Sequence, residues 1–180
     1  ASFFQSVTTR TAGFATIPQE NLTDSSAIVS LILMFIGGSP VGTAGGIKTV
    51  TFLVMIVTAI SVIRNRRSAN VFGRQIAEEA IRKAVGVFVM SFCVVAVSTI
   101  LLSYVTNADF MDVIYETVSA TATVGLTRNL TPSLNTSGKL IITIAMFLGR
   151  VGPISLAVAL NKNKGSENIV SNPVEDIVVG

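Results

Sequence analysis

The stretch Ala84–Val105 limits the possible folds of this chain more than any other feature, because it is long and carries no charged side chain. As an α-helix it is about 33 Å long, enough to cross a hydrocarbon core of about 30 Å. Lys139–Leu160 predicts a second crossing helix, with Arg150 near its middle. Charged residues make up 13% of the chain, about half the share found in soluble domains. These features predict an all-α membrane protein.

A second long stretch, Asp24–Ile63, cannot form one straight helix. As a single helix it would span about 60 Å, twice the thickness of the hydrocarbon core. The segment Gly37–Gly46 contains five glycines and a proline, which do not hold a regular helix. We therefore expect half-helices at Ser25–Ile36 and Lys48–Ile63. Irregular backbone at membrane depth is tolerated where it lines a cavity, so the break is expected to line one.

The composition argues against an enzyme. The chain has no histidine and only one cysteine. It therefore lacks the residues that form the usual zinc sites and the Ser-His or Cys-His pairs of nucleophilic catalysis. Cys93 stands among apolar residues and is expected to be a buried, unreactive side chain. The segment GGSPVGTAGGIKT is similar to a phosphate-binding loop, but Ile47 separates Gly46 from Lys48 and the flanking runs are of membrane length.

Eight of the thirteen basic residues flank the apolar runs. They are Arg64, Arg66, Arg67, Arg74, Arg82 and Lys83 in one loop, and Lys162 and Lys164 near the C-terminus. Basic loops next to membrane spans usually lie on the cytoplasmic side. We therefore expect 67–83 to be a cytoplasmic linker and 161–180 to be a cytoplasmic tail. The alternative is a solvated loop without topological meaning.

Two short half-apolar segments, Ser2–Thr11 and Phe110–Ala120, each precede a turn of small residues, and their length is typical of re-entrant helices. The turns match in sequence: Thr9-Arg10-Thr11-Ala12-Gly13-Phe14 corresponds to Thr121-Ala122-Thr123-Val124-Gly125-Leu126. At the same offset, without a gap, Met34-Phe35-Ile36-Gly37 corresponds to Met146-Phe147-Leu148-Gly149. Two motifs in one register indicate an internal repeat.

The repeat divides the chain into units made of a crossing helix, a re-entrant helix with a Thr-x-Gly turn, and a second crossing helix. Residues 84–160 form one complete unit, with helix 84–105, pore loop 109–128 and helix 139–160. Residues 1–66 form a partial unit, with pore loop 2–16 and broken crossing helix 24–63. Because the sequence starts inside a unit, we expect it to belong to a longer chain.

The Thr-x-Gly turns have a specific chemical use. Carbonyl oxygens aimed at one axis can replace the hydration shell of a monovalent cation, and glycine permits the positive φ that this geometry requires. The helix before each turn directs its negative dipole end toward the same point. Each turn is therefore interpreted as a selectivity-filter strand. The expected K⁺-binding residues are Thr11, Ala12, Gly13, Thr123, Val124 and Gly125.

The segments VTTRTAGF, GGSPVGTAGGIKT, SATATVGLT and MFLGRVGPISL resemble the Trk/Ktr/HKT superfamily of potassium transporters, and most closely its KtrB-type membrane subunit. The resemblance implies four repeated units around a pseudo-fourfold, K⁺-channel-like pore, with this chain as the third and fourth. It implies potassium uptake across the cell membrane and leaves Na⁺ coupling open. The implied partners are the lipid bilayer, the N-terminal half of the subunit, a second copy in a homodimer, and a cytosolic nucleotide-binding regulatory subunit.

The resemblance also implies a gate below the filter, formed by an intramembrane loop over Gly38–Thr49 and a pore-facing arginine. The residues that fall on these features are Gly38, Ser39, Gly42, Gly45, Gly46, Lys48 and Arg150. A charge in mid-membrane is costly and usually marks an ion pathway. Alternatively, Arg150 snorkels or pairs with an acidic residue such as Glu116, and Lys48 snorkels to the cytoplasmic side.

Three acidic residues, Asp109, Asp112 and Glu116, share one helix face. We expect Asp109 to cap the re-entrant helix and the other two to face outer water; a cation-attracting vestibule is the alternative. The roles of Arg10 and Arg128 near the filter mouth stay open. A different function that fits broken helices in repeats is secondary transport of a small organic solute. A membrane scaffold would leave Arg150 and the glycine-rich break unexplained.

Overall fold

The computed structural model describes residues 2–39, 44–66 and 68–152, which are mostly helical. Two short 3₁₀ helices, η1 and η2, and one β-hairpin occupy the connections. The elements in chain order are α1 Ser2–Thr8, η1 Gln19–Asn21, α2 Asp24–Phe35, α3 Thr49–Ile63, β1 Asn70–Val71, β2 Arg74–Gln75, α4 Glu78–Val105, α5 Phe110–Thr121, η2 Thr131–Ser133 and α6 Thr136–Val151.

Helix α4 is the longest element, with 28 residues and a length of about 42 Å. Among the described residues it alone is both long and apolar enough to cross a membrane, while α2 and α3 are shorter apolar helices. It starts at Glu78, before the uncharged stretch, and Glu78 and Glu79 in its first turn suit the positive end of the helix dipole. Glu79 also pairs with Lys83 at 2.6 Å.

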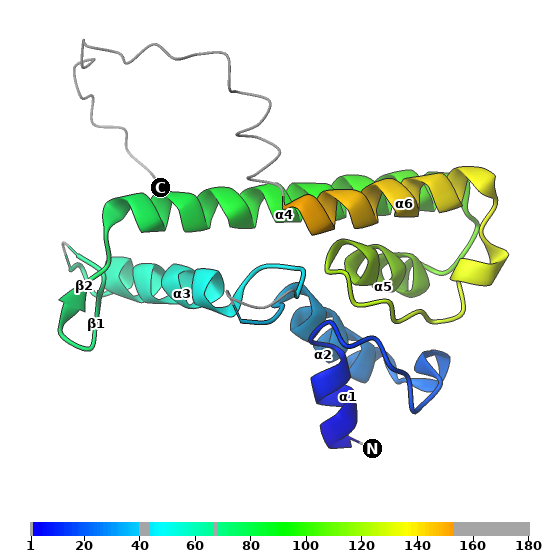
Figure 1. Cartoon of the computed structure of the whole chain (residues 1–180), viewed down its shortest axis with the longest axis horizontal. Coiled ribbons are helices and arrows are strands. Elements are labelled where there is room, and N and C mark those ends of the chain that lie inside the picture. Colours follow the sequence, from blue (N-terminus) through cyan, green and yellow to red (C-terminus); the bar gives the residue numbers. More distant parts are fainter. Residues whose placement is uncertain (1, 40–43, 67, 153–180) are drawn as a thin grey trace, which may run out of the picture.

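The long helices lie side by side (Figure 1). Helix α3 runs along the first half of α4, and α6 runs along its second half. Helix α5 packs against both α4 and α6, and α2 packs against α5. The stretch Asp24–Ile63 is two helices, because α2 ends at Phe35 and α3 begins at Thr49. The expected helix 139–160 is described as α6, which ends at Val151, and 153–160 lie outside the described residues.

Corresponding positions of the two repeats adopt the same local structure. The 3₁₀ helices begin at Gln19 and at Thr131, and α2 and α6 begin at Asp24 and Thr136. The residues before these two helices both act as caps: the Thr23 hydroxyl accepts from the Ser26 N–H, and the side-chain carbonyl of Asn135 accepts from the Gly138 N–H. At these corresponding positions the two segments therefore share the same local structure.

Two groups of buried apolar side chains hold the helices together. One joins α2 to α5 and the turn after it, through Met34, Tyr115, Val118 and Val124 among others. The second fills the space between α4, α5 and α6, through Leu102, Val113, Ile142 and Ala145 among others. Both groups include residues of α5, so the short helix before the second Thr-x-Gly turn is enclosed by the longer ones.

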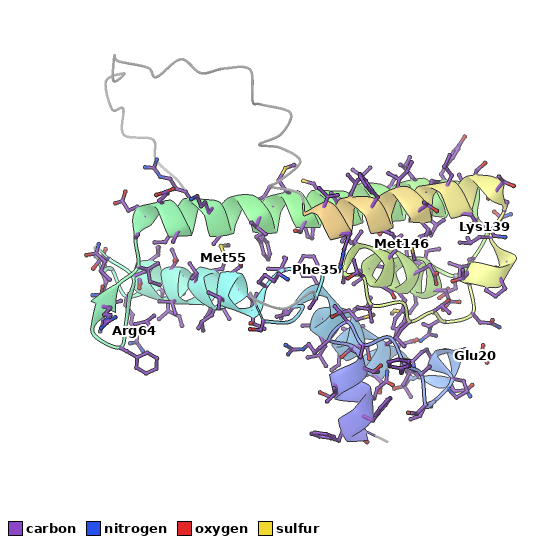
Figure 2. The ribbon with its side chains drawn as sticks, in the orientation of Figure 1. Glu20, Phe35, Met55, Arg64, Lys139 and Met146 are labelled. Carbon is purple, nitrogen blue, oxygen red and sulfur yellow. The ribbon has the colours of Figure 1, made fainter. Side chains whose placement is uncertain are left out.

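The outer faces of α4 and α6 are apolar, whereas charged side chains such as Arg64 and Lys139 lie at opposite ends of the long axis (Figure 2). Ile100 is 68% exposed and Phe147 is 62% exposed. Cys93 is also exposed, so the expectation that it is buried is wrong. The physical reason is that apolar residues of a membrane helix face lipid as readily as a protein core, so an apolar sequence setting does not imply burial.

Candidate functional site

The two Thr-x-Gly turns follow α1 and α5 and share an unusual backbone. Thr11 has a φ of 67° and Thr123 a φ of 55°, while Gly13 and Gly125 have φ values of 75° and 88°. A left-handed conformation is strained for a β-branched residue, and such strain collects at functional sites. The same strained pattern in both repeats marks these turns as the candidate site.

The turns of the two repeats touch each other. A Cβ atom placed on Gly13 would collide with the carbonyl oxygen of Val124, so the backbones meet with no side chain between them. Gly125 faces open space, since no atom of the described residues lies within 4 Å of its ideal Cβ position. The six residues expected to form filter strands are thus brought together as two adjoining segments.

The helix before each turn also holds it by hydrogen bonds. In the first repeat the Thr8 hydroxyl, which is buried, donates to the carbonyl of Phe14 at 2.7 Å. In the second repeat the N–H of Val124 donates to the carbonyl of Ser119 at 2.9 Å. The C-terminal end of α5 is at Thr121, so its negative dipole end lies at the start of the second turn.

Glu116 does not face outer water, which corrects the expectation from the sequence. It is 6% exposed, and its carboxylate accepts hydrogen bonds from the hydroxyls of Thr127, at 2.7 Å, and Thr131. The sequence did not reveal this because both partners lie beyond the turn, on the segment that folds back over α5. A buried carboxylate is tolerated when hydroxyl groups satisfy its oxygens.

The other two acidic residues, Asp109 and Asp112, have different structural roles. Asp109 caps α5, with its carboxylate accepting from the Met111 N–H at 3.2 Å, as the sequence predicted. Asp112 forms an ion pair with Arg128 at 2.7 Å instead of facing water alone. Arg128 also donates to the carbonyl of Leu22, at 3.3 Å, in the other repeat. The positive charge of Arg128 is therefore neutralised by Asp112, and its guanidinium links the two repeats through Leu22.

The two ends of the glycine-rich segment, near Gly37 and Ile47, lie side by side and are joined by backbone hydrogen bonds. The Gly37 N–H donates to the Ile47 carbonyl at 2.8 Å, and the Ile47 N–H donates to the Phe35 carbonyl at 3.0 Å. The Thr49 N–H donates to the carbonyl of Gly38 at 3.2 Å. These bonds close the base of a loop. Ser39 is exposed and Gly46 half-buried in this loop, whereas Gly42 lies outside the described residues.

This loop lies directly against the second turn. A Cβ atom on Gly45 would collide with the carbonyl of Ala122 and the hydroxyl of Thr123. In the first repeat, Arg10 donates to the carbonyl of Gly37 at 3.4 Å. The loop therefore contacts the second turn through Gly45 and the first through Arg10.

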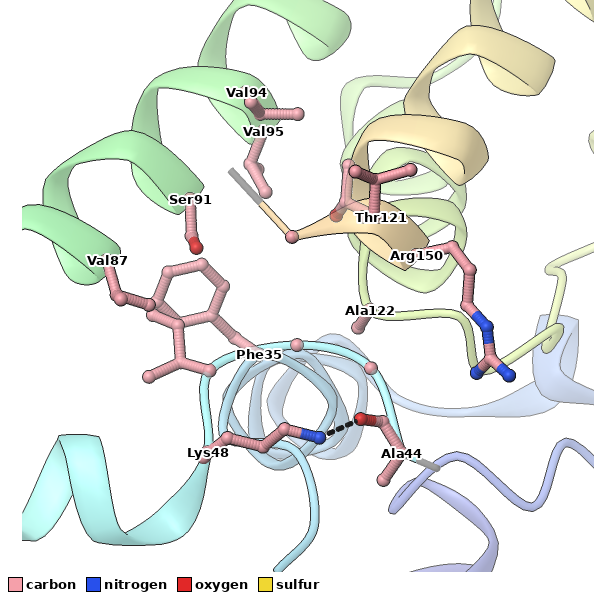
Figure 3. Close-up of a pocket in the computed structure, with 16 residues that line it drawn as sticks. Phe35, Ala44, Lys48, Val87, Ser91, Val94, Val95, Thr121, Ala122 and Arg150 are labelled. Carbon is pink, nitrogen blue, oxygen red and sulfur yellow. Dashed lines mark hydrogen bonds between the residues drawn. The ribbon is translucent and has the colours of Figure 1, made fainter. Parts of the chain in front are cut away.

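A cavity of about 410 Å³ adjoins the loop and the end of α5. Figure 3 shows the side chains of Lys48, Thr121 and Arg150 around it. Lys48 donates to the carbonyl of Ala44. Arg150 lies in the last turn of α6, where the negative end of the helix dipole favours a cation. Gly149 packs against the carbonyl of Thr121, which fixes the end of α6 beside the second turn.

A side-chain metal centre is not evident in the part of the chain that the structure describes, because no three His, Cys, Asp or Glu residues lie close enough to share an ion. Sequence reasoning missed Gln19 and Tyr115, whose side chains join the repeats by a 3.0 Å hydrogen bond. Their wide separation along the chain leaves no local pattern that could have indicated it.

Comparison with known proteins agrees with this architecture. The chain is 40% identical over 166 residues to Ktr system potassium uptake protein B of Bacillus subtilis (strain 168), covering 92% of the chain and 37% of that protein. It is 33% identical over 180 residues to the protein of the same name from Vibrio alginolyticus, covering all of the chain and 39% of that protein. The chain is 35% identical to potassium/sodium uptake protein NtpJ of Enterococcus hirae, covering 99% of the chain and 41% of that protein.

The fold matches the crystal structure of the potassium transporter TrkH from Vibrio parahaemolyticus with a TM-score of 0.73 and 20% sequence identity, covering 88% of the chain and 36% of that structure. The chain thus spans about two fifths of the length of the curated relatives described above. A family model described as TrkH, cation transport protein, matches residues 1–172. The chain therefore belongs to the TrkH family of cation transport proteins.

Proposed function

We propose that this chain supplies two adjoining quarters of a pore that takes up K⁺ across the cell membrane. The observation that carries the proposal is the direct contact between the two Thr-x-Gly turns, at Gly13 and Val124. The relatives named as potassium uptake proteins support K⁺ as the ion. The chemistry is transport without a catalytic step.

The filter residues are Thr11, Ala12, Gly13, Thr123, Val124 and Gly125. Ion selection there rests on backbone carbonyls, which replace the water around a K⁺ ion. The φ angles support this role, because Thr11 and Gly13 are positive on either side of a negative Ala12, and the second repeat alternates in the same way. Glycine adopts positive φ at little steric cost, which lets a short segment direct its carbonyl groups toward one axis.

The gate is the loop Gly38–Thr49 together with Arg150. The contact of Gly45 with Ala122 and Thr123 supports this role, because a loop so close to the second turn can obstruct the ion path. Arg150 lines the cavity on the same side of the filter. A fixed positive charge beside this path repels K⁺, and the repulsion is stronger where water is excluded. Lys48 anchors the loop through Ala44.

The remaining quarters of the pore come from equivalent units of the full-length subunit. We place the linker 64–83 and the C-terminal tail on the cytoplasmic side, from the excess of arginine and lysine there. The partners are the lipid bilayer, a second copy of the subunit and a cytosolic nucleotide-binding regulatory subunit. Na⁺ is a candidate coupling ion, since one relative is named a potassium/sodium uptake protein.

Uptake in cells tests the proposal. The full-length subunit is expressed in a strain that lacks K⁺ uptake, with and without its regulatory partner, and growth at low K⁺ and Rb⁺ accumulation are measured. Restored growth with saturable Rb⁺ uptake is expected. A membrane-inserted protein that restores neither, but accumulates an organic solute, would reject the proposal in favour of secondary transport of that solute.

A further inference from the structure

Gln19 lies at a junction of hydrogen bonds that joins the two repeats. It is the first residue of η1 and is only 3% exposed. Its Oε1 atom accepts from the Gln5 side chain in α1 at 2.6 Å and from the Tyr115 hydroxyl in α5 at 3.0 Å. Gln19 therefore connects the helix that precedes one filter segment with the helix that precedes the other.

The orientation of the Gln19 amide follows from its partners. Its Nε2 group donates to the carbonyl of Ile17 at 2.7 Å, and a backbone carbonyl can only accept. The Oε1 atom must then face Tyr115 and Gln5, which both donate to it. The amide is fully satisfied in a buried position, so the junction is rigid.

Both ends of this connection lead to a filter segment. Tyr115 is fully buried and packs in the same apolar group as Ala122 and Val124. Gln5 lies on the same short helix as Thr8, whose hydroxyl holds the carbonyl of Phe14 directly after the first segment. A displacement at Gln19 would therefore move one segment relative to the other.

The equivalent position in the second repeat shows what is particular to Gln19. That position is Thr131, the first residue of η2, which donates to Glu116 of its own α5. Each repeat thus braces its re-entrant helix from the same position. Of these two positions, within the described part of the chain, only Gln19 extends the brace to the other repeat, through Tyr115.

We propose that Gln5, Gln19 and Tyr115 form a strut that fixes the spacing of the two filter segments and thereby sets the discrimination of K⁺ from Na⁺. This inference rests on the proposed function. Selection by carbonyl groups depends on their number and placement around the ion. The three side chains are positioning residues, because they hold the helices that carry the filter and do not touch the ion.

The first test is Tyr115→Phe in the full-length subunit, which removes one hydroxyl and keeps the ring in the core. The ratio of K⁺ to Na⁺ uptake should decrease by a factor of about two to ten. This factor corresponds to the free energy of one net hydrogen bond. Membrane abundance is measured in parallel by quantitative immunoblotting, and the thermal midpoint of the purified protein by a fluorescence melt.

Thr99→Val is the matched control. The Thr99 hydroxyl makes a buried 2.8 Å hydrogen bond to Thr117, so it ties α4 to α5 inside one repeat. Its removal should lower the thermal midpoint about as much as Tyr115→Phe does, while the uptake ratio stays at the parental value. This comparison separates a loss of stability from a loss of filter spacing.

Gln19→Met and the double variant with Tyr115→Phe complete the test. If the strut acts as one unit, the double variant discriminates no worse than Gln19→Met alone. A parental uptake ratio in Tyr115→Phe, an equal fall in Thr99→Val, or additive effects in the double variant would each overturn the inference. A parent that shows no preference for K⁺ would reject the proposed function itself, so the two failures are distinguishable.

Discussion

Gly13 packs against the carbonyl group of Val124, although the two residues belong to different repeats and are far apart in the chain. The contact leaves no room for a side chain at position 13. It also makes the first Thr-x-Gly turn a neighbour of the second without any intervening element. The geometry of each segment therefore depends on the other, and a change in one repeat is expected to act on both.

Gly13→Ala should destabilise the full-length subunit more than a change of backbone preference alone explains. Gly73 is a matched control, since its φ of 76° is close to the 75° of Gly13 and nothing lies near its ideal Cβ position. Positive φ costs each alanine about 1–3 kcal/mol. Gly13→Ala also brings the new Cβ atom into collision with the backbone of Val124, which cannot move aside as a flexible side chain can.

The measurement is the thermal midpoint of each purified variant in detergent. The larger decrease is expected for Gly13→Ala. Equal decreases for both alanine variants would contradict the contact between Gly13 and Val124.

Glu116→Leu should destabilise the segment after the second turn, because the hydroxyls of Thr127 and Thr131 lose a charged acceptor. A hydrogen bond to a charged group contributes about 1.5–3 kcal/mol, so losing both is expected to lower the free energy of unfolding by about 3–6 kcal/mol. Glu116→Gln keeps one acceptor oxygen and should cost less. Chemical denaturation of the purified subunit measures both. A Glu116→Leu variant as stable as the parent would mean that this carboxylate faces water after all.

How far the sequence predicts this structure depends on the range of the interaction. The motifs that recur in one register predict the repeat, and the glycines and proline after Ile36 predict the separation of α2 from α3. These features depend on local backbone preferences and on helix length. The partners of Glu116 and Gln19 depend on how segments fold over one another, which no local pattern records. The exposure of Cys93 could not be predicted either, because an apolar sequence neighbourhood does not distinguish contact with lipid from contact with protein.

Gly45→Ala tests the gate. A Cβ atom at this position would collide with the carbonyl of Ala122 and the hydroxyl of Thr123. The loop should then move away from the second filter segment, and K⁺ flux should rise several-fold at equal membrane abundance. Initial rates of Rb⁺ uptake into cells or proteoliposomes measure the effect. A fall in flux, with normal abundance and thermal midpoint, would argue against a gate at this contact.

Arg150→Ala should raise the maximal rate of K⁺ transport and leave the discrimination of K⁺ from Na⁺ nearly unchanged. The side chain lines the cavity beside Thr121 and Ala122, where a positive charge opposes the passage of a cation. Arg150→Lys is the matched control, because it keeps the charge and should keep the parental rate. Concentration dependence of Rb⁺ uptake gives the maximal rate. If Arg150→Ala transports more slowly at equal abundance, the arginine has a structural role instead.

The central claim is that the Thr-x-Gly turns select the ion, and Gly125→Ser tests it most directly. Gly125 has a φ of 88° and open space at its ideal Cβ position, so a serine distorts the carbonyl geometry without colliding with the described residues. Uptake of K⁺ and Na⁺ is measured side by side for the full-length parent and variant at matched membrane abundance. The account predicts that Gly125→Ser admits Na⁺ and lowers the K⁺ to Na⁺ uptake ratio at least several-fold. An unchanged ratio in a normally expressed variant would contradict it.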